Sequence, residues 1–502
     1  MLKTCLINPL FTEPASGGRE RYFVRSGSRW PSSYLKPVGR PGRYLPFPFF
    51  LAYAAALLEE HGFPVSVLDA VAANARQDEL IAYVRDRRPD LVFYETTTPT
   101  IARDLSLAPI LKAETGARIV LAGPHATTFA REILEAHPAV DCILLYEYEV
   151  TLCELVSRLA KQEDLDGVPG LAWRRGPEIV CQPDYRPIEP LDRLPLPARA
   201  HFPVSGRPDL NRYWDGFCQH RPAVQMHASR GCPFRCDFCL WVQVMYRDGR
   251  YRTFSPSRVV DEMLEVVERY GAREVYFDDD DFTVSREHVL GICREILGRG
   301  LRLPWSCMGD AVAPDESLLD AMAEAGCVGM KFGLESANPG ILKRLGKPLD
   351  LERVAGIARG CRRRRIKTHA TVSLGLWNET RQSASETLSF VKALDVDSVQ
   401  FSIATPFPGT RYHREMLEAG RLAGTDWERY DGARFAAAAV PGIAPAELQL
   451  LCAQAPRQWL AAKLRNPGWL FRQARYGLRV LRGQGLAGVA DRIRRAWEIL
   501  GR

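Results

Sequence analysis

Short apolar runs alternate with helical patterns along two long stretches of this chain, and the alternation restricts its fold more than any other feature. In the first stretch a helix is predicted over residues 50–60, and apolar strand-like runs occur at residues 5–9, 65–69, 91–94, 118–122 and 142–145. Such strands belong to parallel sheets with helices on both faces. Residues 1–185 are therefore predicted to form a Rossmann-like α/β domain.

The second stretch follows a segment rich in proline and arginine, residues 186–222, which is predicted to be a linker because it lacks periodicity. A helix is predicted over residues 256–270, since Ser255 precedes it and Gly271 follows it. Repeated strand–helix units over residues 223–415 predict a full or partial (β/α) barrel, with function at the carboxyl ends of its strands. Its strand-like segments are residues 274–277, 329–333, 368–373 and 398–403.

The carboxyl ends of the N-terminal strands carry residues that suit a ligand, because ligands of parallel sheets bind at that edge. Glycine and threonine at these positions leave backbone and hydroxyl groups available for contact. Ordinary turn chemistry also explains each segment when it is taken alone. The candidate ligand-binding residues at this edge are Asn8, Thr97, Thr98, Gly123, Pro124, His125 and Glu147.

A long polar insertion separates the first predicted strand from the first predicted helix. Residues 12–45 hold seven Lys or Arg and two Glu, with five aromatic side chains among them. Unstructured loops of more than about 12–15 residues inside a domain are usually functional lids or disordered segments. The aromatic content favours order, and two interpretations remain: a loop strapped onto the surface or a lid over a ligand.

Three cysteines, Cys232, Cys236 and Cys239, lie within eight residues, and Gly231 and Pro233 favour a loop there. Three unrelated thiols would rarely fall so close together. A structural zinc site would need a fourth ligand, often from a second Cys or His pair, and no second C-x-x-C pair follows. An iron–sulfur cluster with three protein ligands leaves one iron open for a substrate or cofactor. The spacing alone leaves both metal sites open.

The cysteine loop, with the aromatic Phe238 before its last cysteine, resembles that of the radical S-adenosylmethionine (SAM) enzymes. Later segments resemble, in order, motifs of the cobalamin-binding branch of that superfamily: residues 277–283, 332–336, 375–380 and 405–410. The N-terminal stretch is similar to the cobalamin-binding module of this family, and the resemblance covers about residues 1–415. It implies a Rossmann-like cobalamin-binding domain followed by a partial (β/α) radical SAM barrel.

The same resemblance implies three cofactors: a [4Fe–4S] cluster, SAM and cobalamin. The three cysteines would hold three irons, and the fourth iron would bind SAM. Asp280, with Asp279, would pair with the amino group of SAM, and such a bond is stronger in a desolvated site. Glu335 and Ser336 would lie at the ribose, and Phe238 at the adenine. Cobalamin would contact the sheet-edge residues named above.

The chain departs from the family pattern at several positions. Tyr146 stands where the family usually has glycine, and Trp377 and Asn378 replace a Pro-Gly pair. Asp310 stands where the family often has arginine. No Asp-x-His-x-x-Gly sequence occurs, so the resemblance implies that cobalamin binds without His125 as its lower ligand.

The resemblance implies an enzyme that makes a 5′-deoxyadenosyl radical, most simply a C-methyltransferase that uses methylcobalamin on an unactivated carbon. A non-methylating relative that performs cyclisation, ring contraction or oxidation is the alternative. A zinc-stabilised nucleic-acid-binding protein is the alternative of another class. The expected partners are a small-molecule or lipid-like substrate and an external electron donor of the flavodoxin or ferredoxin type, with no specific nucleic acid.

Charge is concentrated at the C-terminus, in the region 416–502 that is predicted to be helical. The net charge of the 502 residues is +7, and residues 457–502 hold eleven Lys or Arg against two Asp or Glu. Aromatic and aliphatic side chains are interspersed there, which is typical both of a helix on an anionic membrane and of a helical cap on the barrel. The 13 cysteines are too dilute for a disulfide framework, so a reducing cytoplasmic location is expected.

Overall fold

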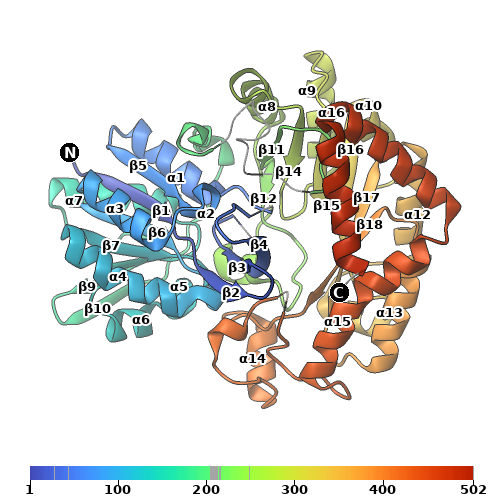
Figure 1. Ribbon diagram of the computed structural model, residues 1–502. Helices are drawn as coiled ribbons and strands as arrows, with labels where there is room; N and C mark the ends of the chain where they lie inside the picture. The colour runs from blue at the N-terminus through green and yellow to red at the C-terminus, as the bar shows by residue number, and fades with distance from the viewer. Residues whose placement is uncertain are drawn as a thin grey trace.

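The computed structural model describes residues 1–500 apart from 28, 43, 204–212, 214, 215, 248 and 433, and it leaves the side chains of 483, 484, 487, 491, 492 and 494–500 undescribed. Two α/β units lie side by side, and the N-terminal unit occupies the left of Figure 1. A small antiparallel sheet lies in front of the junction between them. Part of the predicted linker 186–222 falls outside the described residues.

The N-terminal unit is built on a seven-stranded sheet of order β10-β9-β8-β7-β6-β1-β5. Its parallel strands confirm the predicted pattern: β1 (Thr4–Asn8), β5 (Val65–Asp69), β6 (Leu91–Glu95), β7 (Arg118–Ala122) and β8 (Cys142–Leu144). An antiparallel hairpin, which the sequence reading missed, extends the edge as β9 (Leu171–Arg175) and β10 (Glu178–Gln182). The helices are α1 (Phe49–Glu60), α2 (Ala70–Ala73), α3 (Gln77–Arg87), α4 (Ile101–Thr115), α5 (Pro124–Thr128), α6 (Ala130–Ala136) and α7 (Glu149–Lys161).

The second unit is a partial barrel, an open parallel sheet of order β11-β14-β15-β16-β17-β18. Its strands are β11 (Ala223–Met226), β14 (Glu274–Phe277), β15 (Trp305–Gly309), β16 (Cys327–Glu335), β17 (Lys367–Leu374) and β18 (Ser398–Ile403). The sequence reading missed β15, because Ser306 and Gly309 interrupt its apolar character. The intervening helices are α8 (Pro256–Tyr270), α9 (Arg286–Gly298), α10 (Glu316–Glu324), α11 (Pro339–Leu345), α12 (Leu351–Arg363) and α13 (Arg381–Ala393).

The helix α8 shows how local sequence sets the limits of an element. The Ser255 side chain accepts a hydrogen bond from the backbone N–H of Arg258, at 3.4 Å, and so caps the first turn. Gly271 ends the helix in the left-handed region, with φ 63°. Both predicted boundaries are confirmed.

The polar insertion forms a three-stranded antiparallel sheet of β2 (Thr12–Ala15), β3 (Arg19–Val24) and β4 (Ser32–Pro37). In Figure 1 this dark blue sheet lies in front of the junction of the two units. Ser33 donates its backbone N–H to Asp431 at 3.1 Å, and Arg29 forms an ion pair with Asp278 at 2.7 Å. The insertion is therefore ordered structure that contacts the barrel and the C-terminal region.

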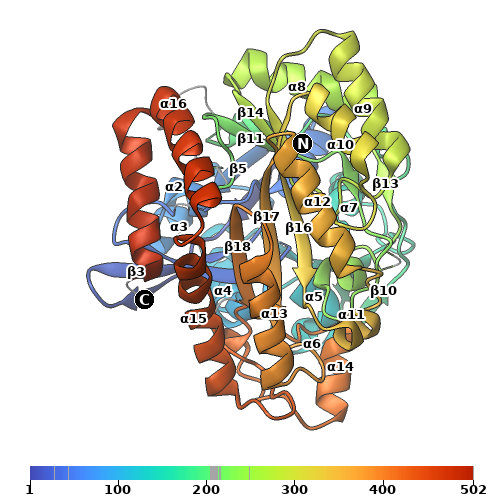
Figure 2. The same ribbon diagram turned by 90° about the vertical axis from the view of Figure 1, so that its right-hand side faces the viewer.

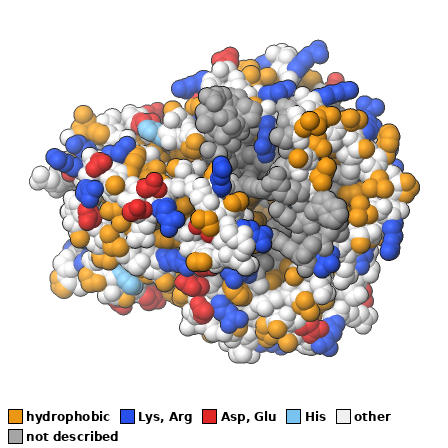
Figure 3. All heavy atoms as spheres, viewed as in Figure 1, with side chains coloured by type: hydrophobic (Ala, Val, Ile, Leu, Met, Phe, Trp, Pro, Cys, Tyr) orange, Lys and Arg blue, Asp and Glu red, His pale blue; other side chains and the backbone are white. Residues whose placement is uncertain are grey.

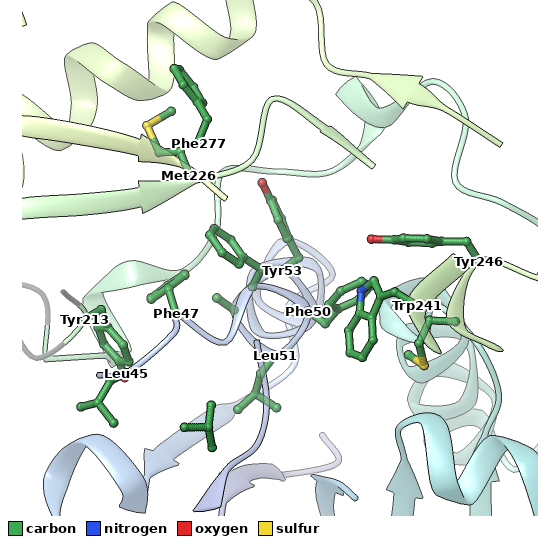
Figure 4. Close-up of a cluster of buried hydrophobic side chains, with 14 of the residues drawn as sticks. Leu45, Phe47, Phe50, Leu51, Tyr53, Tyr213, Met226, Trp241, Tyr246 and Phe277 are labelled. Atoms are coloured by element: carbon green, nitrogen blue, oxygen red, sulfur yellow. The ribbon is translucent and has the colours of Figure 1, made fainter. Parts of the chain in front are cut away.

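Helix α1 lies between the two main sheets and joins their cores. Its side chains project toward both units in Figure 4. Leu51 points to the N-terminal sheet, whereas Phe50 packs against Trp241 with ring centroids 6.0 Å apart. Tyr53 stacks on Phe254 at 6.1 Å. Because one helix is buried on both faces, it reads as apolar all round.

The C-terminal region consists mainly of α14 (Arg411–Glu418), α15 (Pro445–Lys463) and α16 (Pro467–Leu500), which confirms its predicted helical character. Figure 2 shows α15 and α16 beside β18 at the open edge of the barrel sheet. Trp469 donates its indole N–H to the Asp397 carbonyl at 3.2 Å and packs against Trp459 at 6.0 Å. Trp497 and Ile499, which belong to the aromatic and aliphatic residues interspersed in this basic region, have side chains outside the described residues. Within the part of the chain described, no helix has the length and apolarity needed to cross a bilayer.

Candidate active site

The three cysteines lie on a loop whose backbone carbonyls accept hydrogen bonds from one side-chain amide. This loop follows β11 and the short strand β12 (Ser229–Arg230), and it ends at a π-helical turn, Trp241–Met245. The Gln243 Nε2 group donates to the carbonyls of Cys236, Asp237 and Cys239 at 3.0, 2.8 and 3.1 Å. The loop backbone therefore has a fixed shape before any metal binds.

The chemistry of the cysteine loop fits an iron–sulfur cluster better than zinc. Burial raises the pKa of Cys236 to about 12 and that of Cys239 to about 11, so each thiol must lose a proton when it binds metal. Among the described residues, no three His, Cys, Asp or Glu side chains converge on one ion-sized position, as a zinc site requires. Three thiolates on one short loop instead suit a cluster in which each cysteine holds a different iron.

The acidic run after β14 supports the start of the cysteine loop. Asp279 is fully buried and accepts hydrogen bonds from Ala228 N and Ser229 Oγ at 2.8 and 2.6 Å. Asp280 accepts one from Gly231 N at 2.9 Å. Burial raises the pKa of Asp279 to about 7. The structure thus places both predicted acids against the segment that leads into the cluster loop, and their contact with the SAM amino group stays a prediction.

Glu335 ends β16 at a strained position, with φ 62° in the region that favours glycine. Its carboxylate accepts hydrogen bonds from Lys347 Nζ at 3.2 Å and Ser373 Oγ at 2.9 Å. Lys347 also lies close enough to Cys236 for its ammonium to oppose the rise that burial causes in the pKa of that thiol. Ser336 is buried and meets Thr387 at 3.3 Å between their hydroxyl oxygens.

A cavity of about 650 Å³ occupies the inner face of the open barrel, beneath the insertion. Phe238 and Glu335 both line it, so two predicted SAM-binding residues meet at one site. From above, the insertion contributes Arg29 and Trp30, and Trp30 packs edge-on against Phe238 with centroids 5.9 Å apart. Farther along the barrel, its polar lining includes Lys331, Lys367, His369, Ser373, Ser398 and Gln400.

The edge predicted to bind cobalamin brings Thr98, Gly123 and His125 together. His125 Nδ1 lies 3.2 Å from Thr98 Oγ1, and the ring packs against Trp427 with centroids 5.3 Å apart. Burial lowers the pKa of His125 to about 3, so its ring is neutral. At Gly123, φ is 99° and a Cβ atom would lie 2.3 Å from the Thr96 carbonyl oxygen, which makes glycine necessary there.

Not every residue predicted at that edge is open to a ligand. Asn8, the last residue of β1, donates its side-chain N–H to Asp69 Oδ1 at 2.9 Å. Both oxygens of Glu147 are engaged, by Arg230 at 2.9 Å and by Arg252 at 2.9 Å. The cobalamin contacts of Asn8 and Glu147 stay predictions, and the structure gives each of them a stabilising partner.

A buried ion-pair network joins the two units at this point. Arg230 contacts Glu147 at 2.9 Å and Glu149 at 2.7 Å, and all three side chains are fully buried. The guanidinium also lies over the Phe50 ring, 4.6 Å from its centroid. Since Arg230 lies two positions before Cys232, the network fixes the cluster loop against the N-terminal unit.

The departures from the family pattern have local explanations. Tyr146 and Asn378 have φ 64° and 59°, a backbone conformation that glycine, the residue expected at both positions from the resemblance, adopts without strain. Asp310 caps its own loop by accepting a hydrogen bond from Ala313 N at 2.6 Å, and it receives another from Thr283 Oγ1 at 3.1 Å.

Comparisons with known proteins agree with this geometry. The radical SAM superfamily model matches residues 226–391, and the B12 binding domain model matches residues 37–156. An uncharacterized methyltransferase of Pyrococcus horikoshii is 30% identical over 402 residues, covering 80% of this chain and 84% of that protein. The chain belongs to the cobalamin-binding radical SAM family. An anaerobic magnesium-protoporphyrin IX monomethyl ester cyclase of Cereibacter sphaeroides is 28% identical, covering 76% of this chain and 62% of that protein.

Solved structures confirm the fold of this cobalamin-binding radical SAM enzyme. The radical SAM methyltransferase TsrM of Kitasatospora setae superposes with a TM-score of 0.63 at 22% identity, covering 84% of this chain and 76% of that protein. The family membership accounts for the [4Fe–4S] cluster, SAM and cobalamin as cofactors. The three-cysteine loop and the glycine-lined sheet edge are the parts of this chain that fit them.

Four residues of the site were not predicted from the sequence: Arg29, Arg230, Lys347 and Ser373. Arg29 reaches Asp278 across 249 positions, and Ser373 reaches Glu335 across 38. Their residue types are common, and local spacing gives no sign of the contact. Only Arg230 had a usable signal, because it directly precedes the Gly-Cys start of the cysteine loop.

We expect Glu335→Gln to weaken SAM binding by roughly 10- to 100-fold, because a hydrogen bond to a charged acceptor contributes about 1.5–3 kcal/mol. Equilibrium dialysis with SAM on cluster-loaded protein measures the change. Exposed Glu352 on α12 provides the matched control, Glu352→Gln, which should bind SAM normally. Wild-type affinity in Glu335→Gln would limit this carboxylate to its pairing with Lys347.

Proposed function

We propose that this enzyme is a C-methyltransferase that transfers a methyl group from cobalamin to an unactivated carbon of a small molecule. The observation that carries the proposal is one cavity that is lined by Phe238 of the cysteine loop, by Glu335 of the barrel, and by Arg29 and Trp30 of the insertion of the cobalamin-binding unit. Radical and methyl-donor chemistry then act on one bound substrate. The methyltransferase relative that matches 80% of this chain supports the proposal.

The chain's own residues position the reactants and exclude water. The bound cluster, SAM and cobalamin supply the radical and the methyl group. Phe238 and Glu335 orient the adenosine part of SAM, and Trp30 covers Phe238 from the insertion. An aromatic side chain that covers the site in this way shields a reactive species from solvent.

The lining of the cavity favours a polar substrate over a purely aliphatic one. His369, Thr371, Ser398 and Gln400 line its wall on β17 and β18. Sites that hydrogen-bond a substrate reject analogues that lack the partner group, since the buried polar atoms are then left unsatisfied. We therefore propose a small molecule with several hydrogen-bonding groups.

Product analysis tests the proposed reaction. Protein reconstituted with iron, sulfide and methylcobalamin is supplied with SAM, reductant and metabolite extract from a deletion strain. The expected result is one 5′-deoxyadenosine for each new product whose mass has increased by one methylene unit. Formation of 5′-deoxyadenosine with a product that lacks the added methyl would favour the cyclisation chemistry of the cyclase relative instead.

We also propose that α16 makes a peripheral contact with an anionic membrane, with the enzyme acting in the cytoplasm. Six of its large apolar side chains are more than a third exposed: Leu470, Phe471, Leu478, Leu481, Leu486 and Ile493. Hydrophobic side chains gather on the right of the face shown in Figure 3, over this helix. Arginines interspersed among them would meet anionic headgroups.

We expect the double variant Phe471→Ser and Leu478→Ser to bind phosphatidylglycerol liposomes at least about tenfold more weakly, because each buried apolar side chain contributes about 1.5–3 kcal/mol. Cosedimentation measures the change. The control Leu297→Ser removes an exposed leucine on α9, outside the proposed contact, and should bind like wild type. If the double variant binds as tightly as the control, α16 is a cap on the barrel and not a membrane contact.

A further inference from the structure

We propose that an acidic one-electron carrier protein docks on the face formed by the outer side of the cysteine loop together with α11 and α14. The inference rests on the proposed function and names the surface through which the cluster is reduced. One electron leaves the reduced carrier and enters the oxidised cluster, so no proton and no other reactant are needed. The carrier is of the flavin or iron–sulfur class.

The cysteine loop reaches the surface with its outer side. Pro233 and Arg235, between the first two cysteines, are exposed, whereas the cysteines themselves are half-buried. An electron crosses a short distance faster than a long one, so the carrier should approach where little protein covers the cluster. The loop provides that position.

Two helices bracket this loop and extend the surface around it. The first residue after α11, Gly346, lies so close that a Cβ there would be 4.0 Å from the Arg235 carbonyl oxygen. The start of α14 is hydrogen-bonded to the loop: Tyr412 N donates to the Asp237 carbonyl at 3.0 Å, and Arg411 N donates to Gln243 Oε1 at 2.8 Å. Loop and helices therefore form one continuous rigid face.

The charge of this face is positive. Its cationic residues are Arg235, Lys343, Arg344, Arg411 and Arg414, and its carboxylates outside the core are Glu415 and Glu418. Glu415 forms ion pairs with Arg344 at 2.5 Å and with Arg411 at 3.9 Å. Arg235, Lys343 and Arg414 are exposed, and Leu417, which is 59% exposed, adds an apolar contact on α14. A cationic face around an apolar residue matches an acidic partner and steers its approach.

A second basic groove lies at the end of the barrel opposite to the cysteine loop, too far from the cluster to serve as the carrier's docking face. Arg365, Arg472, Arg475 and Arg479 line a separate cavity of about 250 Å³. Arg365 lies two positions before β17, at the amino end of that strand, whereas the cysteine loop follows the carboxyl end of β11. Charge alone would favour either surface, and only the first adjoins the cluster. The second groove therefore supplies a control.

Charge reversal tests the docking face on full-length, cluster-loaded enzyme. The variant carries Lys343→Glu and Arg414→Glu, and the matched control carries Arg365→Glu and Arg475→Glu from the second groove. Formation of 5′-deoxyadenosine from SAM is followed with limiting reduced flavodoxin as carrier and, separately, with dithionite. We expect the carrier-dependent rate of the first variant to fall at least about tenfold while its dithionite rate stays within about twofold of wild type. The control should keep both rates.

Carrier binding is measured in parallel by titration calorimetry with oxidised flavodoxin at low and high salt. Wild type should bind more weakly as salt rises, and the first variant should bind weakly at both salt concentrations. An unchanged carrier-dependent rate and unchanged affinity in that variant would overturn the docking proposal. If wild type makes no 5′-deoxyadenosine with either reductant, the proposed function fails, and the calorimetric comparison still decides whether this face binds the carrier.

Discussion

Replacing Cys232, Cys236 and Cys239 by serine, singly or together, should abolish SAM cleavage. Serine is a poor ligand for iron at a position built for a thiolate, and a cluster with two remaining protein ligands has no defined open iron. Anaerobically reconstituted variants should lack the broad brown absorbance that bleaches on reduction. Iron and sulfide analysis should show far less than four of each per chain. Chromatographic assay of 5′-deoxyadenosine should find only background.

The matched control is Cys181→Ser, a half-buried free cysteine on β10 far from the loop in sequence. It should retain iron, colour and SAM cleavage. Retention of turnover in the loop variants would contradict the assignment of all three cysteines to the cluster. A colourless wild-type protein that binds one zinc would do the same.

Replacing Arg230 by methionine should destabilise the apo-protein by about 3–5 kcal/mol in the free energy of unfolding, because it leaves buried carboxylates without a cation. In this variant Glu147 still has Arg252 at 2.9 Å and the Tyr185 hydroxyl at 2.6 Å. Most of the loss in stability should therefore come from Glu149, whose ion pair with Arg230 is removed. Urea unfolding followed by circular dichroism measures the loss.

A second substitution should restore part of the stability that Arg230→Met loses. Adding Glu149→Gln to Arg230→Met removes the orphaned charge and should recover part of the lost stability. The control Arg175→Met breaks the exposed pair of Arg175 with Glu178 on the β9–β10 hairpin and should unfold near the wild-type midpoint. Wild-type stability in Arg230→Met would show that the network does not hold the two units together.

Local sequence was sufficient for the regular elements. Strands such as β7 (Arg118–Ala122) are apolar and buried after their first residue because helices cover both faces of the sheet, and α8 carries a signal at each of its ends. Strand β15 was missed for the opposite reason. Its burial comes from the neighbouring strands β14 and β16, and its own residues give no apolar run.

The cysteine spacing and the order of the later motifs were enough to predict the family and its cofactors, because the three predicted thiolate ligands lie within one short loop. The insertion was different. Its aromatic content indicated order, yet its three-stranded sheet is fixed by contacts with Asp278 and Asp431, which lie hundreds of positions away. The local sequence of the insertion could not distinguish a lid over a ligand from a loop that only covers the surface.

The local sequence was enough for the two α/β units, the family and its cofactors, since strand periodicity and motif spacing are local properties. Tertiary structure alone decided that Glu147 and Glu149 pair with Arg230, more than 80 positions away, and that Lys347 joins Glu335 beside Cys236. Whether a buried carboxylate binds a cofactor or an arginine depends on which cation the folded chain brings within about 3 Å, because a buried charge without a partner costs far more free energy than a paired one.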